Sequence, residues 1–111
     1  MKKSEAIEIA RTTHDVVLDK ANTQFSSVNK SKSVWWIEIA LRKLDEHQTI
    51  NLVVEKSGTV TLLQVPTEFL KTNIDGLRTR EEKQLLCLEI DIDTFENRVG
   101  SGRYSFKSFV V

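Results

Sequence analysis

Two adjacent tryptophans, Trp35 and Trp36, stand in residues 34–44, the most regular alternation of apolar side chains in the chain. In an extended segment neighbouring side chains point to opposite faces, so Ile37 and Ile39 share a face with Trp35. The alternation therefore predicts a strand with that face in the core. Because Trp36 points to the other face, one large ring has to meet a second layer, a loop or a partner.

Two further alternating segments, residues 49–55 and 59–65, are separated by the turn sequence Lys56-Ser57-Gly58. Alternating segments on either side of such a turn predict a β-hairpin. Together with residues 34–44 they predict an antiparallel meander. More strands are expected at residues 77–80, 86–92 and 103–111.

The apolar residues of the N-terminal segment, residues 4–21, recur at three- and four-residue steps, which predicts an amphipathic helix with Ser4 as its N-cap. Residues 22–33 are polar, serine-rich and without periodicity, so they are expected to form a mobile loop. Pro66 favours the start of a short crossover helix. Gly76 is expected to follow that helix in the left-handed conformation.

These elements predict a single α+β domain over residues 1–111, with a mostly antiparallel sheet of five or six strands in a sheet-rich body at residues 34–111. A half-open barrel is the alternative architecture. The N-terminal helix is expected to cover the sheet face that carries Trp35 and Ile37. An apolar content of 40%, with one proline and four glycines, excludes the collagen-like and disordered classes.

The charges of the chain balance, because 16 Lys and Arg stand against 16 Asp and Glu. This balance argues against a surface built as a whole to attract nucleic acid or anionic lipid. The distribution is uneven, since residues 34–93 carry a net charge of −4 and the segments on either side carry +2 each.

Cys87 is the only cysteine, so a disulfide within the chain is impossible and a cytoplasmic location fits best. Glu5 and Glu8 interrupt the apolar stretch that a signal peptide would need. No apolar run approaches the ~20 residues of a membrane span, so no association with a membrane is expected.

A metal site is not expected, because the two histidines, His14 and His47, stand alone without the spacing of metal ligands. The best row of carboxylates is Glu89, Asp91 and Asp93, on one face of a predicted strand. With ligands from elsewhere this row could hold a divalent cation, although such rows are commonly solvated.

Three further places in the chain carry residues found in catalytic motifs. Glu81-Glu82-Lys83 resembles half of a metal-nuclease core, but it lies in a predicted turn and not on a rigid strand. Gly100-Ser101-Gly102 lacks the context of a phosphate-binding loop. Cys87 has no histidine beside it that could activate the thiol. We therefore expect a protein that is not an enzyme and needs no cofactor.

The remaining candidate is a recognition surface around Trp36. Its predicted strand face also carries Glu38 and Arg42, and Arg78 and Arg80 would complete an aromatic and basic patch if their strand lies near. Tryptophan and arginine are enriched at the centres of binding interfaces. In the alternative interpretation, Trp36 simply covers the second sheet face beneath a loop or the short helix.

Three sequence segments carry a resemblance to known proteins: residues 35–39, residues 65–80 and residues 86–90. They resemble small uncharacterised bacterial domains of unknown function, some of which accompany restriction-type or HNH nucleases. The likeness extends over residues 34–110. It implies an accessory or free-standing bacterial protein. No catalytic residue carries over, because the histidine-containing motif of an HNH nuclease is absent.

The leading hypothesis is a non-enzymatic binding module that associates with itself as a homodimer, with another protein as a possible partner. An open strand edge and spare apolar residues motivate it, namely Trp36, Val53, Leu63 and Phe109. The alternative is a nucleic-acid-binding accessory protein that uses residues 30–32 and the basic side chains Arg42, Arg78, Arg80 and Lys83. A metal-dependent enzyme built on the carboxylate row comes last.

Overall fold

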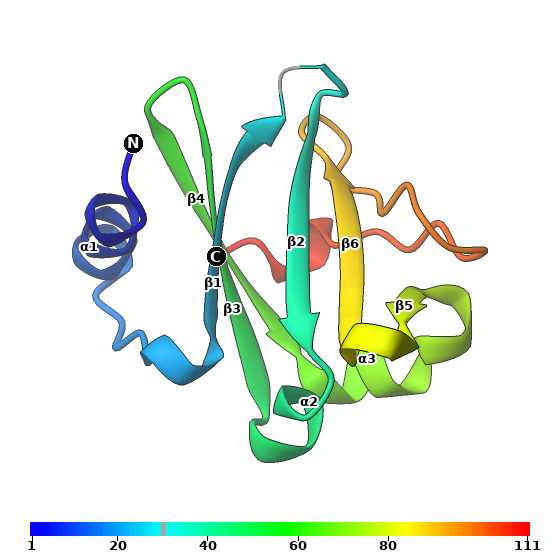
Figure 1. The fold of residues 1–111 in the computed structure, drawn as a ribbon. Helices are drawn as coiled ribbons and strands as arrows, with labels where there is room; N and C mark the ends of the chain where they lie inside the picture. The colour runs from blue at the N-terminus through cyan, green and yellow to red at the C-terminus, as the bar shows by residue number, and fades with distance from the viewer. Residues whose placement is uncertain (30) are drawn as a thin grey trace.

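The computed structural model describes residues 1–29 and 31–111, which form one six-stranded sheet with a helix on its outer side (Figure 1). The strands are β1 Thr23–Asn29, β2 Val34–Ala40, β3 Thr49–Lys56, β4 Thr59–Pro66, β5 Arg78–Arg80 and β6 Leu85–Asp91. The α-helices are α1 Lys3–His14, α2 Lys43–Glu46 and α3 Thr67–Thr72, and short 3-10 helices are η1 Lys20–Asn22, η2 Ile74–Gly76, η3 Glu81–Lys83 and η4 Lys107–Phe109. The α+β class is confirmed.

The strand order is β4-β3-β1-β2-β6-β5. Among the described residues β1 and β3 run parallel and the other neighbouring strands are antiparallel. The predicted β3–β4 hairpin, the predicted strand around Trp35 and the predicted strand at residues 86–92 are confirmed. The predicted meander is wrong, because β1 separates β2 from β3.

Strand β1 also corrects the mobile loop expected at residues 22–33. It pairs with β3 over five positions, from Thr23 opposite Asn51 onward. Its two large apolar side chains, Phe25 and Val28, lie an odd number of residues apart and so point to opposite faces, which removes the alternation by which a strand is recognised. Lys30 lies outside the described residues.

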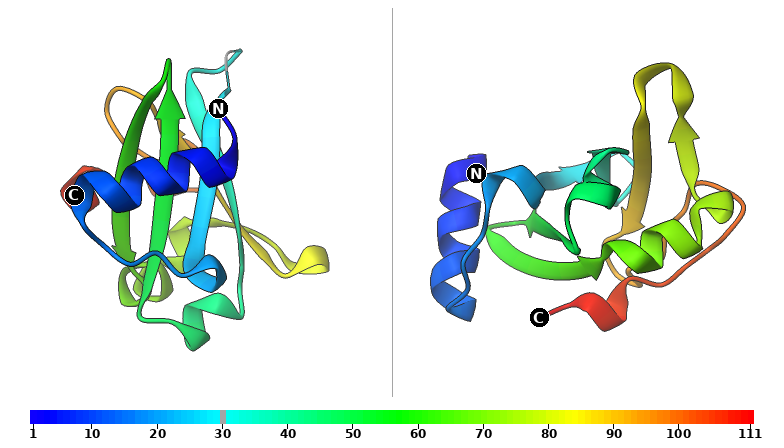
Figure 2. Two further views of the ribbon diagram at one scale, coloured as in Figure 1. Left: turned by 90° about the vertical axis from the view of Figure 1, so that its left-hand side faces the viewer. Right: turned by 90° about the horizontal axis from the view of Figure 1, so that it is seen from below.

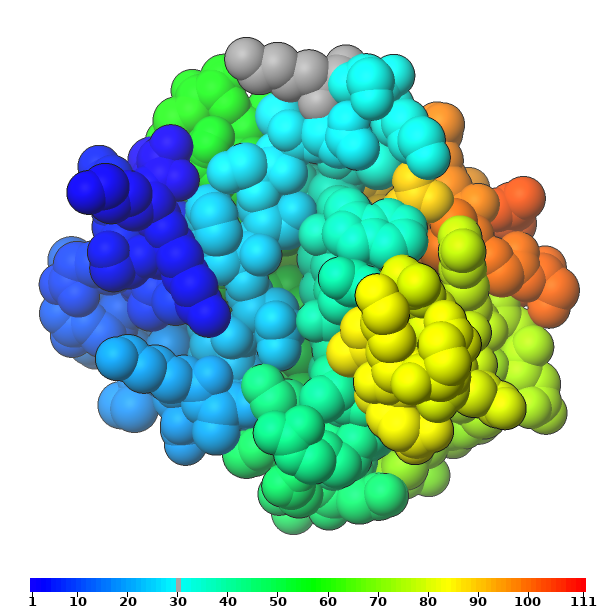
Figure 3. Space-filling model, in the orientation of Figure 1, coloured from blue at the N-terminus to red at the C-terminus, as the bar shows by residue number. Residues whose placement is uncertain are grey.

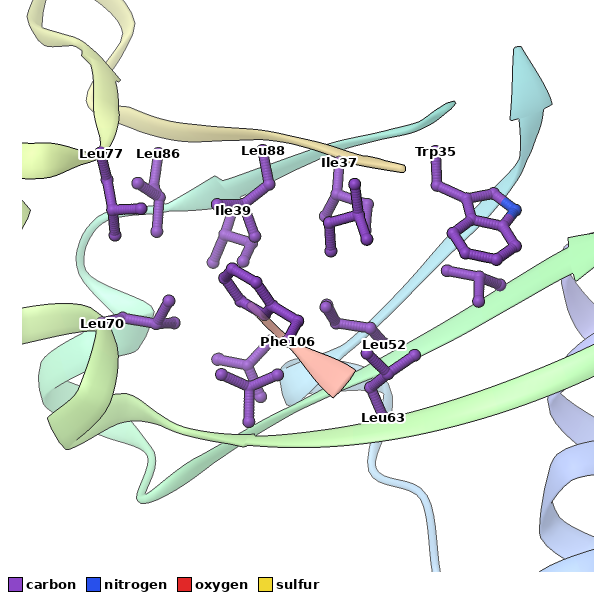
Figure 4. Packing of buried hydrophobic residues seen from close by; sticks show 14 of the residues in the cluster. Trp35, Ile37, Ile39, Leu52, Leu63, Leu70, Leu77, Leu86, Leu88 and Phe106 are labelled. Carbon is purple, nitrogen blue, oxygen red and sulfur yellow. The ribbon is translucent and has the colours of Figure 1, made fainter. Parts of the chain in front are cut away.

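The main core lies on the inner, concave side of the curled sheet (Figure 2). Side chains of β2 and β6 face those of β3 and β4 across it, and the ring of Phe106 lies between the two sets (Figure 4). Phe106 is fully buried and belongs to the irregular C-terminal segment, residues 92–111. The strand expected at residues 103–111 does not form.

The C-terminal segment closes the inner core by running from β6 to β4. Asn97 forms an isolated bridge with Ile90 of β6, and Val110 forms one with Leu63 of β4. The Val111 N–H donates to the Leu62 carbonyl at 3.0 Å. The edge of β4 is therefore partly occupied by the chain's own end, whereas β5 remains an edge strand among the described residues. Val53 and Leu63, expected to be spare apolar residues, are fully buried.

Helix α1 lies on the outer face, across β1, β3 and β4 (Figure 2). Ala6 and Ala10 are buried there against Val53 and Leu62. The expectation that this helix covers Trp35 and Ile37 is wrong, because those side chains point to the inner core. Small alanines on the buried stripe let the helix approach the sheet closely.

The N-terminal helix is shorter than the predicted residues 4–21. It ends where Asp15 adopts the left-handed conformation, with φ 51°, and its N-cap is Lys2 rather than Ser4. Val17, expected on the buried stripe, is consequently 93% exposed. No helix of the described residues is long and apolar enough to cross a membrane, and the longest, α1, has 12 residues.

Gly76 does not take the left-handed conformation that the sequence predicts. It is part of η2, and Tyr104 lies directly over it. A Cβ atom on Gly76 would lie 2.3 Å from the Tyr104 hydroxyl. A side chain at residue 76 would therefore have to displace the Tyr104 ring, while the backbone angles of Gly76 impose no such restriction.

Candidate functional site

The outer faces of β2, β6 and β5 lie beside α1 and not beneath it (Figure 1). We call this surface the open face and define it by Trp36, Glu38, Arg78, Arg80 and Cys87. Figure 3 shows it hollowed along the line between β1 and β2, with α1 on one side and the β5–β6 hairpin on the other. The hairpin stands out from the sheet (Figure 2), so the open face is a trough and not a flat surface.

One row of the open face places an acid and a base on either side of a thiol. Cys87 is paired in register with Glu38 of β2 and with Arg78 of β5, so all three side chains lie on the same face. The Cys87 sulfur lies 4.0 Å from Glu38 Oε2. Glu38 and Arg78 are exposed, whereas Cys87 is fully buried.

Burial raises the pKa of the Cys87 thiol, and the Glu38 carboxylate raises it further, while Arg78 opposes both. The thiol is therefore held in its neutral form, which is a poor nucleophile.

The neighbouring rows place Trp36 and Arg80 on the same face. Trp36 is half-buried and stands opposite Glu89 of β6, whose carboxylate lies 3.5 Å from Lys32 Nζ. Arg80 stands at the other end of the open face, and its Nε lies 3.2 Å from Glu82 Oε1. The charged side chains of these two rows, Glu89 and Arg80, are thus already paired with other residues of the same chain.

Arg42 is the one predicted binding residue that the structure separates from this group. It lies beyond the end of β2, as the residue that precedes α2, and its Nε lies 3.5 Å from Glu46 Oε1. The alternation of β2 would have placed Arg42 beside Glu38, but the strand ends at Ala40. Four of the five predicted residues therefore share one surface.

The carboxylate row proposed as a metal site serves three separate structural purposes. Asp91 Oδ1 accepts from the N–H groups of Asp93 and Thr94, each at 2.8 Å, and its other oxygen pairs with Arg98. Glu89 pairs with Lys32, and Asp93 lies 4.0 Å from Lys56 Nζ. In the part of the chain that the structure describes, no group of three or more His, Cys, Asp or Glu side chains is placed to hold a metal ion.

Hydrogen bonds from the backbone N–H groups of Thr94 and Asp93 lower the pKa of the Asp91 carboxyl, and the Arg98 guanidinium adds to this effect against the opposing contribution of burial. Asp91 therefore fixes the loop that follows β6. The buried Asn97 completes this loop, since its Oδ1 accepts from the Glu89 N–H at 3.0 Å and its Nδ2 donates to the Val99 carbonyl at 2.8 Å.

A pocket that the sequence did not predict opens at one end of the inner core. Its volume is about 310 Å³, and its lining is Trp35, Lys56, Ser57, Thr59, Thr61, Ile92 and Phe95. The sequence did not indicate it, because the alternation of residues 34–44 assigns Trp35 wholly to the core. No local pattern signals that the β3–β4 turn and residues 92–95 meet around this tryptophan.

A second hollow, of about 470 Å³, lies beneath the start of α1. Its lining consists of Lys2, Lys3, Ser4, Ile7 and Lys20. The lysines are exposed, so water can solvate each ammonium group without help from a ligand. We regard this hollow as a solvated gap between the helix and the chain that follows it.

Comparisons with protein-family models, with curated proteins and with solved structures return no match. The resemblance of residues 34–110 to bacterial domains of unknown function stays a prediction. The function has to be argued from the chemistry of the surfaces themselves, because a fold class alone does not determine an activity.

Proposed function

We propose that this chain is a small non-enzymatic binding module of a bacterial cytoplasm and that its open face binds a second copy of itself. The observation that carries the proposal is the row Glu38–Cys87–Arg78, in which an exposed acid and an exposed base stand on either side of one residue. Such a row is complementary to itself. The location is supported by the single free cysteine, which needs no oxidising compartment.

The complementarity follows from the geometry of a two-fold dimer, in which the same patch is used by both copies. Neighbouring strands are about 4.8 Å apart, so Glu38 and Arg78 lie at roughly equal distances on either side of Cys87. A two-fold axis along β6 above Cys87 therefore places Arg78 of each copy over Glu38 of the other. The same rotation brings each protruding β5–β6 hairpin over the trough of the other copy.

Trp36 supplies the apolar part of this interface. Its ring is half-buried on the same face of β2, two residues before Glu38. A large ring that can be desolvated next to a pair of charges is the usual composition of an interface centre. Opposite charges across the interface fix the register of the two copies.

The test is sedimentation velocity at concentrations up to the high micromolar range, on the wild type and on charge-reversal variants. We expect the wild type to dimerise, and Glu38→Arg and Arg78→Glu each to be monomeric, because each places like charges opposite one another. The double variant carrying both reversals restores the opposite-charge pairs and should dimerise again. Trp36→Ala should weaken the dimer.

Lys107→Glu is the matched control, because it reverses an exposed charge on the C-terminal segment, away from the open face. It should leave the dissociation constant unchanged. A wild-type protein that stays monomeric at high micromolar concentration overturns the proposal. So does a double reversal that fails to dimerise while it remains folded by circular dichroism.

The nucleic-acid alternative gains no specific support from the placement of its basic side chains. Arg42, Arg80 and Lys32 each lie within 3.5 Å of a carboxylate oxygen of the same chain. Arg42 lies beyond the end of β2, away from Arg78 and Arg80, so these basic side chains do not share one surface. We therefore do not propose it as a second function.

A further inference from the structure

We propose that the pocket at the end of the inner core binds a small aromatic ligand that carries one acidic group. The site is independent of the open face, because Trp35 and Trp36 point to opposite sides of β2. Trp35 forms the end of the row of inner side chains (Figure 4), where the apolar interior meets the pocket.

The pocket combines an apolar interior with polar groups at its rim. Trp35, Ile92 and Phe95 provide two rings and an aliphatic side chain. Ser57, Thr59 and Thr61 provide hydroxyl groups, and Lys56 provides a positive charge. Small-molecule sites are commonly mostly apolar hollows of about 300–1,000 Å³ with a few polar groups that orient the ligand.

The two aromatic side chains of the pocket, Trp35 and Phe95, are held in place by contacts within the chain itself. The Trp35 indole Nε1–H donates to the Glu55 carbonyl at 3.0 Å, and its ring centroid lies 5.7 Å from that of Phe95. Phe95 itself has a φ of 62°. For so bulky a residue the left-handed region is strained, and strain of this kind is kept where the surrounding structure holds it in place.

Two backbone hydrogen bonds hold Phe95 in this conformation. Its N–H donates to the Asp91 carbonyl at 3.0 Å, and its carbonyl accepts from the Phe106 N–H at 2.8 Å. Asp91 in turn fixes the next part of the loop through the N–H groups of Asp93 and Thr94. The loop thus holds the Phe95 ring against Trp35 in a left-handed backbone conformation.

The charge of the ligand follows from Lys56. Its ammonium lies 4.0 Å from Asp93 Oδ1, and the two side chains are 49% and 79% exposed. An exposed pair at this distance contributes at most about 1 kcal/mol, so another carboxylate can replace Asp93 at little cost. An acidic group on the ligand can therefore pair with Lys56 while its ring packs against the touching side chains of Trp35 and Phe95.

The size of the pocket limits the ligand to one or two fused rings. At about 310 Å³ the volume is close to the lower end of the range for small-molecule sites. Indole-3-acetate, indole and tryptamine are suitable probes because they share one ring system and carry a negative, a zero and a positive charge. Their comparison separates the contribution of the ring from that of the charge.

The test is a titration of ¹⁵N-labelled protein followed by NMR, in which the indole N–H signals of Trp35 and Trp36 report on the two surfaces separately. We expect indole-3-acetate to shift the Trp35 signal saturably and to leave the Trp36 signal in place. Indole should bind about fivefold more weakly, which corresponds to the loss of one exposed ion pair, and tryptamine more weakly still.

Substitutions at the rim test the charge directly. Lys56→Gln should weaken indole-3-acetate about fivefold, and Asp93→Asn should strengthen it, because the competing carboxylate is removed. Lys71→Gln is the matched control, since Lys71 forms a similar pair with Asp45, at 3.8 Å and 43% exposure, far along the chain. It should leave the affinity unchanged. Phe95→Leu should reduce the affinity of all three probes.

Three results would overturn the proposal. The first is the absence of any saturable shift at Trp35 up to millimolar indole-3-acetate. The second is equal binding of the three probes, which would remove the acidic group from the argument. The third is a Lys56→Gln variant that binds as the wild type does. The rim variants keep the test valid even if Phe95→Leu fails to fold.

Discussion

The two halves of the outer sheet face differ in the polarity and burial of their outward-pointing side chains. On β3 and β4 the outward positions include Val53 and Leu62, which are fully buried beneath α1. On β2 and β5 the outward positions include Glu38 and Arg78, which are exposed. The same sheet therefore receives a helix where its outer side chains are apolar and stays open where they are charged, and the inner core holds both halves together.

The largest effect is expected where both halves depend on the same side chain. Phe106→Ala empties the space between the two sides of the inner core and should lower the free energy of unfolding by about 3–5 kcal/mol. Urea denaturation measures this loss. Phe109→Ala, which truncates a partly buried ring of the same aromatic cluster, should cost clearly less. Equal costs would mean that Phe106 does not occupy the centre of the core.

A smaller effect is expected beneath the helix. Ala10→Leu adds volume where α1 approaches the sheet and should cost about 1–3 kcal/mol in unfolding free energy, because a packed interface has no room for the larger side chain. Thr13→Leu adds a similar side chain at an exposed position of the same helix and should change stability by less than about 0.5 kcal/mol. If Ala10→Leu is neutral, α1 is not closely packed on the outer face.

The loop that follows β6 makes stability depend on pH. Because the pKa of Asp91 is lowered in the folded chain, its carboxylate stabilises the fold above its unfolded pKa of about 3.9. This contribution is lost as the pH falls through the folded value. Asp91→Asn should therefore lower the urea midpoint at pH 7, and its difference from the wild type should shrink below about pH 4. A difference that is constant from pH 7 to pH 3 would contradict this role.

The smallest effect on the fold is expected on the open face. Arg78→Gln should change the unfolding free energy of the monomer by less than about 0.5 kcal/mol, since its side chain is exposed. The measurement is urea denaturation at low micromolar protein. A loss above about 1 kcal/mol would make Arg78 part of the fold and would remove the contrast between the two halves.

The inner face of the sheet could be predicted because its strands alternate cleanly. Trp35, Ile37 and Ile39 are buried as predicted, and so are the inward-facing residues Ile50, Leu52 and Val54 of β3 and Leu86, Leu88 and Ile90 of β6. Strand β1 could not be predicted, because it is stabilised by pairing with β3, whose partner residues lie about 28 positions later in the chain. The periodicity of α1 likewise indicated a buried stripe without indicating which sheet face would receive it.

For the candidate surfaces too, the sequence indicated which residues of one strand share a face but not which distant segments meet. The sequence grouped Trp36 and Glu38 correctly on one face, since both lie in a single strand. It could join Arg78 to them only by assuming that β5 lies near, which the register through Cys87 shows. The pocket around Trp35 depends on a turn and an irregular loop that meet in space, and neither has a periodic pattern.

Strands β1 and β2 are in register at only two positions in the described chain, Val28 opposite Trp35 and Asn29 opposite Val34. The sheet is thus two three-stranded leaves that share hydrogen bonds near one end only. Away from that end the two leaves are therefore held together by the inner core and not by backbone hydrogen bonds. Backbone amides of residues 23–27 that face β2 should exchange with solvent faster than those that face β3.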